Sequence, residues 1–351
     1  MKRKEFLQQV SLGLGSIVLS GGLLSCSKGK ENGPDENPIE GNPIKTDGTL
    51  RIGVITDVHK DYFPYADEYL EKFITAATAA NVDFIIQIGD FTYPHFRNDG
   101  FLSIWNSFDG LKYHVLGNHD MDTSSKADFL NYVDQRDLGA HYSFDANGFH
   151  IVVLDTNFIK QGNSYTPYNA RNYASHPNNE IGFVSPEQLE WLKNDLAKAD
   201  KPTVLFSHQH LNGSAGNSQE IQTIIREENK KGKKVIASFS GHNHQNWLVE
   251  VDKVSHIQIN SSSYFYVGPN FPDVTGRFPE NVENNYSVMK KSAPYDDSLF
   301  AIVDFKGPER IIQIEGRESN FIAPSPYDLG YYTYRDQMSP SSNINNRTIK
   351  F

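Results

Sequence analysis

Five short apolar runs, each followed within three residues by Asp, Asn or His, constrain the fold of this chain most strongly. Each run has the length and composition of a buried strand. The carboxyl ends of parallel strands gather at one edge of a sheet, so the loops that follow them can converge on one point. The predicted strands cover residues 51–56, 84–88, 113–116, 203–206 and 235–239.

Helical patterns alternate with these strands and predict an α/β fold. One helix is expected over residues 67–80 and another from Pro186 to about residue 199, with Ser185 as N-cap and Gln188 as its capping partner. We expect a two-sheet β-sandwich flanked by helices, in which the closing strands form a second, antiparallel-rich sheet. These closing strands are predicted at 247–251, 255–259, 300–305 and 310–314, and a further strand at 149–154 belongs to the alternating part of the chain.

The first 26 residues predict export and lipid attachment. Three cationic residues at positions 2–4 precede a short apolar run over 10–24, which falls short of the ~20 residues that a membrane span needs. Leu23-Leu24-Ser25-Cys26 resembles a bacterial lipobox, and Cys26 is the only cysteine of the chain. We therefore expect a signal peptide over 1–25 and an exported protein held by a lipid on Cys26 at the periplasmic or cell-surface side of a bacterial membrane.

Composition divides the rest of the chain. Residues 26–49 are polar and rich in Gly and Pro, which predicts a flexible tether. The main domain is expected over 50–316, and residues 317–351 form an extension for which no regular pattern predicts a structure. A net charge of -10 argues against specific nucleic-acid binding. It leaves a nucleotide as one candidate among small phosphorylated substrates, because bound metal ions supply local positive charge; the oligomeric state stays open.

The clusters at the strand ends predict a metal site. Imidazole and carboxylate donors without a thiolate favour Mn, Zn or Fe over Ca or Cu(I). Each cluster alone is also common in surface turns, but their ordered recurrence at strand ends favours one shared site. The candidate residues are Asp57, His59, Asp90, Asn118, His119, Asp120, His208, His242 and His244.

This ordered set resembles the signature of the calcineurin-like metallophosphoesterase superfamily: Asp-x-His, Gly-Asp, Gly-Asn-His-Asp/Glu, His and Gly-His-x-His. The resemblance covers about residues 50–316 and implies the metallophosphatase-type sandwich and two divalent or trivalent metal ions. It implies Asp57, His59, Asp90 and His244 as ligands of one ion, and Asp90, Asn118, His208 and His242 as ligands of the other. Asp90 would bridge the ions, a hydroxide would be the second bridge, and phosphate mono- or diesters would be hydrolysed.

The resemblance also implies roles beside the metals. Asn118 and His119 would contact the substrate, and His119 would donate a proton to the phosphate or the leaving group. Asp120 could orient His119. His210, two residues after His208, could contact substrate or only support the site.

Three alternatives remain open from the sequence. Gly89-Asp90-Phe91-Thr92-Tyr93 also fits a purple acid phosphatase block, which would make Tyr93 a ligand of ferric iron, but His59 stands where those enzymes typically have Gly. The second alternative is a protein without enzymatic activity: a surface lipoprotein that binds a ligand through a degenerate site. The third alternative concerns the long segments 157–182 and 261–295. Aromatic residues of the second segment either stack on a substrate or, as we favour, pack the loop. These residues are Tyr264, Phe265, Tyr266, Phe271 and Phe278.

Overall fold

The computed structural model describes residues 48–232, 234–268, 271–332 and 339–351. The expected signal peptide, Cys26 and nearly all of the expected tether lie outside these ranges. Within them, no helix has both the length and the apolar character that crossing a membrane requires.

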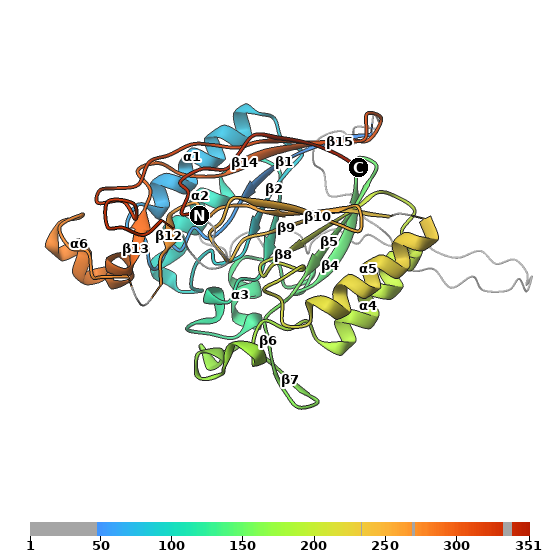
Figure 1. The fold of residues 1–351 in the computed structure, drawn as a ribbon, viewed down its shortest axis with the longest axis horizontal. Coiled ribbons are helices and arrows are strands. Elements are labelled where there is room, and N and C mark those ends of the chain that lie inside the picture. Colours follow the sequence, from blue (N-terminus) through green and yellow to red (C-terminus); the bar gives the residue numbers. More distant parts are fainter. Residues whose placement is uncertain (1–47, 233, 269–270, 333–338) are drawn as a thin grey trace, which may run out of the picture. The chain divides into compact units, whose positions relative to one another are not determined.

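Two six-stranded sheets form the framework (Figure 1). The first has the order β16-β15-β14-β1-β2-β3, from β1 (Thr49–Ile55), β2 (Phe84–Ile88), β3 (Leu111–Val115), β14 (Ala301–Lys306), β15 (Ile311–Glu315) and β16 (Arg347–Lys350). The second has the order β10-β11-β9-β8-β5-β4, from β4 (Tyr142–Ala146), β5 (Phe149–Leu154), β8 (Thr203–Ser207), β9 (Val235–Ser240), β10 (Trp247–Val251) and β11 (Val254–Gln258). The expected α/β sandwich is confirmed.

The closing strands do not form the second sheet that the sequence analysis predicted. They are divided between the two sheets: β10 and β11 extend the second, where β11 pairs parallel to β9, while β14 pairs antiparallel to β1 in the first. The reason is that both β1 and β9 would otherwise leave an unpaired edge, and each edge is covered by a later strand.

The C-terminal extension over residues 317–351 ends in a β-strand. Their last strand, β16, pairs antiparallel with β15 and completes the first sheet. Ile344 and Ile349 are buried in the apolar layer between the two sheets. The extension is therefore part of the sandwich at its C-terminal end.

Alternate side chains of each strand enter different layers, as the twofold period of a strand requires. Ile52 and Ile151 lie between the sheets, whereas Ile55 and Val152 face the helices. Helices α1 (Ala66–Ala79), α2 (Asp99–Asn106) and α3 (Lys126–Tyr132) pack with the first sheet, and α4 (Pro186–Lys198) and α5 (Ser218–Gly232) cover the second (Figure 1). The order of layers is helix, sheet, sheet, helix.

Smaller elements occupy the two long segments. The first holds the hairpin of β6 (Phe158–Gln161) and β7 (Ser164–Pro167), followed by the 3-10 turns η3 (Asn172–Ser175) and η4 (Asn178–Glu180). The second holds β12 (Tyr264–Tyr266), α6 (Glu280–Asn285), η5 (Ser287–Lys291) and β13 (Ser292–Pro294), with β12 and β13 paired. Two further 3-10 turns, η1 (Phe96–Asn98) and η2 (His119–Met121), follow β2 and β3.

The carboxyl ends of five parallel strands lead into the predicted clusters. In the first sheet β1, β2 and β3 run parallel, and in the second β8 and β9 do. The loops that follow are joined by backbone hydrogen bonds: the amides of Asp57 and His59 donate to Gly89 and Asp90 at 3.0 Å each, and that of Gly241 donates to His208 at 3.1 Å. Adjacent ends of the two sheets thus bring the clusters together.

Candidate metal centre

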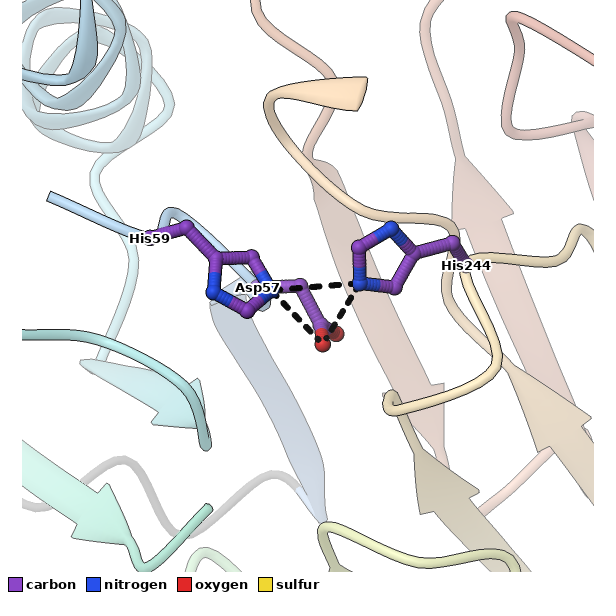
Figure 2. A group of neighbouring side chains, drawn as sticks. All are labelled: Asp57, His59 and His244. Carbon is purple, nitrogen blue, oxygen red and sulfur yellow. Dashed lines mark hydrogen bonds and ion pairs between the residues drawn. The ribbon is translucent and has the colours of Figure 1, made fainter. Parts of the chain in front are cut away.

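Asp57, His59 and His244 form the first of two donor groups (Figure 2). The Nε2 atom of His244 lies 3.1 Å from Oδ1 of Asp57 and 3.2 Å from Nε2 of His59, and the latter is 3.7 Å from the same carboxylate oxygen. All three residues are at most 5% exposed. Three donors from separate segments therefore converge on one point.

Asp90, His208 and His242 form the second group. The Nε2 atom of His208 lies 3.1 Å from Oδ2 of Asp90, and the rings of His208 and His242 are 5.0 Å apart between centroids. Nε2 of His59, in the first group, is 3.8 Å from the same Asp90 oxygen. Asp90 consequently faces both groups.

Two backbone carbonyls determine which ring nitrogen of His208 and of His244 carries a proton. Nδ1 of His208 lies 2.9 Å from the Ile88 carbonyl, and Nδ1 of His244 lies 2.6 Å from the Tyr264 carbonyl. A carbonyl can only accept, so each Nδ1 carries a proton and each Nε2 is directed at a carboxylate oxygen. This second contact of a ligating imidazole is typical of metal sites.

Unpaired buried atoms in these groups fit a bound cation. Nε2 of His208 and Oδ1 of Asp57 have no hydrogen-bond partner. Nε2 of His208 lies 3.1 Å from Oδ2 of Asp90, and Oδ1 of Asp57 lies 3.1 Å from Nε2 of His244. Buried polar atoms are normally paired, and leaving one unpaired costs ~1–3 kcal/mol. A divalent ion bound by the lone pairs would satisfy both atoms, so the donor set fits a first-row metal.

Burial and neighbouring charges shift the pKa values of four expected ligands. Burial favours the neutral acid at Asp57 and Asp90, but attraction to His244 and His208 respectively holds the pKa of each carboxyl well below its ordinary value. Burial and repulsion from His208 lower the pKa of His242 to about 3. Burial disfavours the charged form of His208, yet the neighbouring Asp90 carboxylate raises its pKa to about 9. A metal ion bound at Nε2 of His208 would therefore displace a proton.

The backbone of the loops is strained where the donors are presented. Five of the seven expected ligands have left-handed φ angles between 51° and 68°, which non-glycine residues seldom adopt. These residues are Asp57, His59, Asp90, His242 and His244. Such strain persists only where the surrounding structure imposes it and is concentrated at functional sites.

Glycines precede three of the clusters because other chain segments approach them closely. A Cβ atom on Gly117 would lie 2.0 Å from the Asp90 amide nitrogen, and one on Gly241 would lie 2.4 Å from Oδ2 of Asp57. The amide next to Gly241, that of His242, donates to this same oxygen at 3.0 Å. The glycines thus let one loop hold the carboxylate of another.

A family model described as calcineurin-like phosphoesterase matches residues 50–246, which carry every one of these donors. The match spans more than half of the chain. The chain belongs to the calcineurin-like phosphoesterase family. It is accordingly a metal-dependent phosphoric ester hydrolase.

Two known proteins show the relationship from different sides. A Fibrobacter succinogenes protein named as a probable cyclic nucleotide phosphodiesterase is 24% identical over 242 residues, which cover 63% of this chain and 82% of the relative. The crystal structure of a dimetal phosphatase from Danio rerio matches with a TM-score of 0.55 and 16% identity, over 78% of this chain and 98% of its own. The second likeness supports the fold.

In this phosphoesterase the partner of His119 is Asp122, not Asp120 as expected. Nδ1 of His119 lies 2.8 Å from Oδ2 of Asp122. The carboxylate of Asp120 instead accepts from the amides of Phe91, Thr92 and Gly117 at 2.7, 3.1 and 2.8 Å. Asp120 therefore ties the loops after β2 and β3 together, and the short 3-10 turn η2 places the residue three positions after His119 beside the ring.

Asn118 and His119 line the same region as the donors. Asn118 is 6% exposed, and the amide of His119 donates to Oδ1 of Asp90 at 2.8 Å. A shallow cavity is lined by His119 together with His59, Asp90, Tyr62 and Tyr93. The cavity therefore lies directly beside residues of both donor groups.

Tyr93 lines the cavity, but its hydroxyl is engaged elsewhere. It donates to the hydroxyl of Tyr62 at 2.7 Å and lies 3.3 Å from Oδ2 of Asp122. Burial and these neighbours raise the pKa of Tyr93 far above its ordinary value, so the phenolate that ferric iron requires is disfavoured. These contacts favour a centre without a tyrosine ligand.

His210 and the expected aromatic residues pack within the protein. His210 is 2% exposed, with its ring 5.0 Å from Trp247 and 5.8 Å from His256, which gives no support to a substrate contact. The preference for packing over stacking on a substrate is confirmed for the buried Tyr264, Phe265, Phe271 and Phe278, while Tyr266 is 37% exposed.

Four residues near the centre were not predicted from the sequence: Asp122, Tyr62, Tyr173 and Gln209. The hydroxyl of Tyr62 donates to Oδ2 of Asp122 at 2.5 Å, and Tyr173 donates to Oδ1 of the same carboxylate. Asp122 could have been suspected, because it follows the Asn-His-Asp block by two residues. Tyr173 lies 51 residues further along, and nothing in its local sequence distinguishes it from other loop tyrosines.

Proposed function

We propose that this phosphoesterase hydrolyses phosphate mono- or diesters with two bound metal ions. One observation carries the proposal: of two neighbouring groups, each of a carboxylate and two imidazoles, the second contains Asp90, whose Oδ2 lies 3.1 Å from His208 and 3.8 Å from His59 of the first. A shared carboxylate offsets the repulsion between two cations held close together. The full set of seven expected ligands lies in this region, which weighs against a degenerate, ligand-binding site.

The protein residues would divide the work. Asp57, His59, Asp90 and His244 would hold one ion, and Asp90, Asn118, His208 and His242 the other. Bound ions supply Lewis acidity for the phosphoryl oxygens and lower the pKa of the attacking water. Mn, Zn and Fe all suit these donors.

His119 is the proposed proton donor to the leaving oxygen. Burial alone would lower its pKa, but Asp90 and the hydrogen-bonded Asp122 raise it above the ordinary value. A ring with a raised pKa keeps its proton to higher pH, and because it lines the cavity beside Asp90 it can donate that proton to the leaving group.

A phosphodiester is the finer substrate class that we place first. The support is the name of the Fibrobacter succinogenes relative, a probable cyclic nucleotide phosphodiesterase. Cyclic nucleotides are thus the first natural diesters to assay, beside an aryl diester and the corresponding aryl monoester.

Metal analysis and turnover on these substrates test the proposal together. Protein purified without chelator should contain two transition-metal ions per chain and hydrolyse at least one ester, and His242→Ala should lose both metal and activity. His141→Ala is the matched control, since that ring packs on Trp191 away from the centre. The proposal would be refuted by wild-type protein that binds no metal, or by wild-type protein that hydrolyses neither phosphate monoesters nor phosphate diesters.

Lipid attachment at Cys26 stays a proposal supported by the N-terminal sequence. Full-length protein expressed in a bacterium should fractionate with membranes and incorporate a labelled fatty acid. A Cys26→Ala protein should lose the label, and its continued membrane association would contradict a lipid anchor.

A further inference from the structure

Tyr173 enters the centre from the long segment between β5 and α4. It lies on η3, is 8% exposed, and stacks on Tyr168 at 4.5 Å between ring centroids. Its ring is also edge-on to His119, with centroids 6.4 Å apart. An inserted segment therefore delivers one buried hydroxyl beside the metal donors.

The hydroxyl of Tyr173 contacts three polar groups. It donates to Oδ1 of Asp122, it accepts from Nδ2 of Asn118 at 3.4 Å, and it lies 3.4 Å from Nδ1 of His119. A phenol has one proton to donate, and an amide nitrogen can only donate. The proton of Tyr173 is thus committed to Asp122, and its oxygen is left to accept from Asn118.

These contacts orient the carboxamide of Asn118. With Nδ2 held by Tyr173, the Oδ1 atom is the end that remains to bind a metal. Nε2 of Gln209 lies 3.5 Å from Oδ1, which agrees with this orientation because an amide nitrogen faces an acceptor. A carboxamide rotated by 180° would present hydrogens to the cation.

The same hydroxyl also acts on the proton donor. Oδ2 of Asp122 accepts a hydrogen bond from Tyr62 and lies 2.8 Å from Nδ1 of His119, so two residues contact this oxygen. Tyr173 holds the other oxygen of Asp122. One side chain therefore reaches both a metal ligand and the carboxylate that orients His119.

We propose that Tyr173 is a positioning residue that presents Oδ1 of Asn118 to the metal and, through Asp122, sets the direction of the His119 ring. This inference rests on the proposed two-metal function, in which Asn118 is a ligand. It assigns a role in the centre to the segment over residues 157–182.

Tyr173→Phe tests the inference, with Tyr168→Phe as matched control. Both changes remove one buried hydroxyl from the same stacked pair, but the Tyr168 hydroxyl accepts from the Gly182 amide and not from the centre. Metal-free protein is titrated with Mn²⁺ by calorimetry, and kcat and KM are measured on an aryl phosphodiester. For Tyr173→Phe we expect two losses of about tenfold each, one in kcat and one in the affinity of the more weakly bound of the two Mn²⁺ ions. KM should stay unchanged. Tyr168→Phe should keep the wild-type values of all three.

A second pair of variants isolates the contact to Asn118. In Asn118→Asp either oxygen can bind metal and no amide needs orienting, so adding Tyr173→Phe should no longer weaken Mn²⁺ binding. An equal loss in both backgrounds would overturn the inference, as would a Tyr173→Phe protein with wild-type Mn²⁺ affinity, or a Tyr168→Phe protein with the same defects. In these three cases wild-type turnover still supports the proposed function. Wild-type protein that binds none of Mn²⁺, Zn²⁺ and Fe²⁺ would refute both.

Discussion

Hydrogen bonds from ring nitrogens decide what each histidine of this protein can do. His208 and His244 give their Nδ1 protons to backbone carbonyls, which leaves Nε2 for a cation. His119 differs because its Nδ1 meets the Asp122 carboxylate. The first arrangement suits a neutral ligand, and the second suits a ring that carries and releases a proton.

Asp122→Asn should shift the pH dependence of turnover. Attraction to Asp122 is one of the causes that raise the pKa of His119, and loss of the charge lowers it. His119 donates its proton, so activity is present below its pKa and is lost as pH rises through it. The alkaline limb of the kcat–pH profile should therefore move to lower pH, with a reduced maximum. An unshifted alkaline limb would show that another group donates the proton.

Gly241→Ala should weaken metal binding. The added Cβ would lie 2.1 Å from Oγ1 of Thr56 and 2.4 Å from Oδ2 of Asp57, so the carboxylate must move. Calorimetric titration with Mn²⁺ should show a loss of about tenfold or more in affinity at one position. Gly100→Ala is the control, because a Cβ there meets no atom within 4 Å; equal affinities of the two variants would argue against this explanation.

At the scale of elements, helix signals in the sequence were reliable for boundaries and less so for side-chain partners. Oγ of Ser185 accepts from the Gln188 amide at 3.3 Å, so the expected N-cap of α4 is confirmed. The Gln188 side chain, however, pairs with the backbone of Asp155, with both bonds at 2.9 Å. It fastens the start of α4 to the end of β5 in place of closing a capping box.

Ser185→Ala should lower the free energy of unfolding by about 1 kcal/mol, the usual worth of an N-cap. Chemical denaturation monitored by circular dichroism measures this loss. Ser103→Ala, on the exposed side of α2, is the control and should be nearly neutral. A Ser185→Ala protein as stable as the control would mean that Gln188 and Asp155 alone hold this end of α4.

At the scale of the whole molecule, strands distant in sequence complete both sheets. β16 lies at the edge of the first sheet and comes from the last residues of the chain, where no sequence pattern predicted structure. Its contribution to the core is local: Ile349 is 8% exposed and Thr348 is exposed. β16 therefore contributes to the core through one of its two faces.

Ile349→Ala should reduce the free energy of unfolding by about 2–4 kcal/mol, because it removes buried methyl groups from the layer between the sheets. Thr348→Ala, on the opposite face of β16, should change it by less than about 0.5 kcal/mol. Denaturant unfolding of the two variants compares them directly. Equal stabilities would show that β16 adds little to the core.

The amino-acid sequence by itself determined the repeated strand-to-cluster pattern, the α/β class and the seven expected ligands from Asp57 to His244. These features are local: a strand period, a glycine that lets two loops approach, and a donor at a strand end are all written in a few adjacent residues. They suffice to identify the family and to predict the donors of a metal centre.

Only the tertiary structure decided which residues surround those donors. It replaced Asp120 by Asp122 beside His119, directed the Tyr93 hydroxyl to Tyr62, buried His210, and divided the closing strands between two sheets. The physical reason is that a hydrogen bond depends on direction and on separation in space. Tyr173 and Asn118 are 55 residues apart along the chain and share a hydrogen bond that no local pattern encodes.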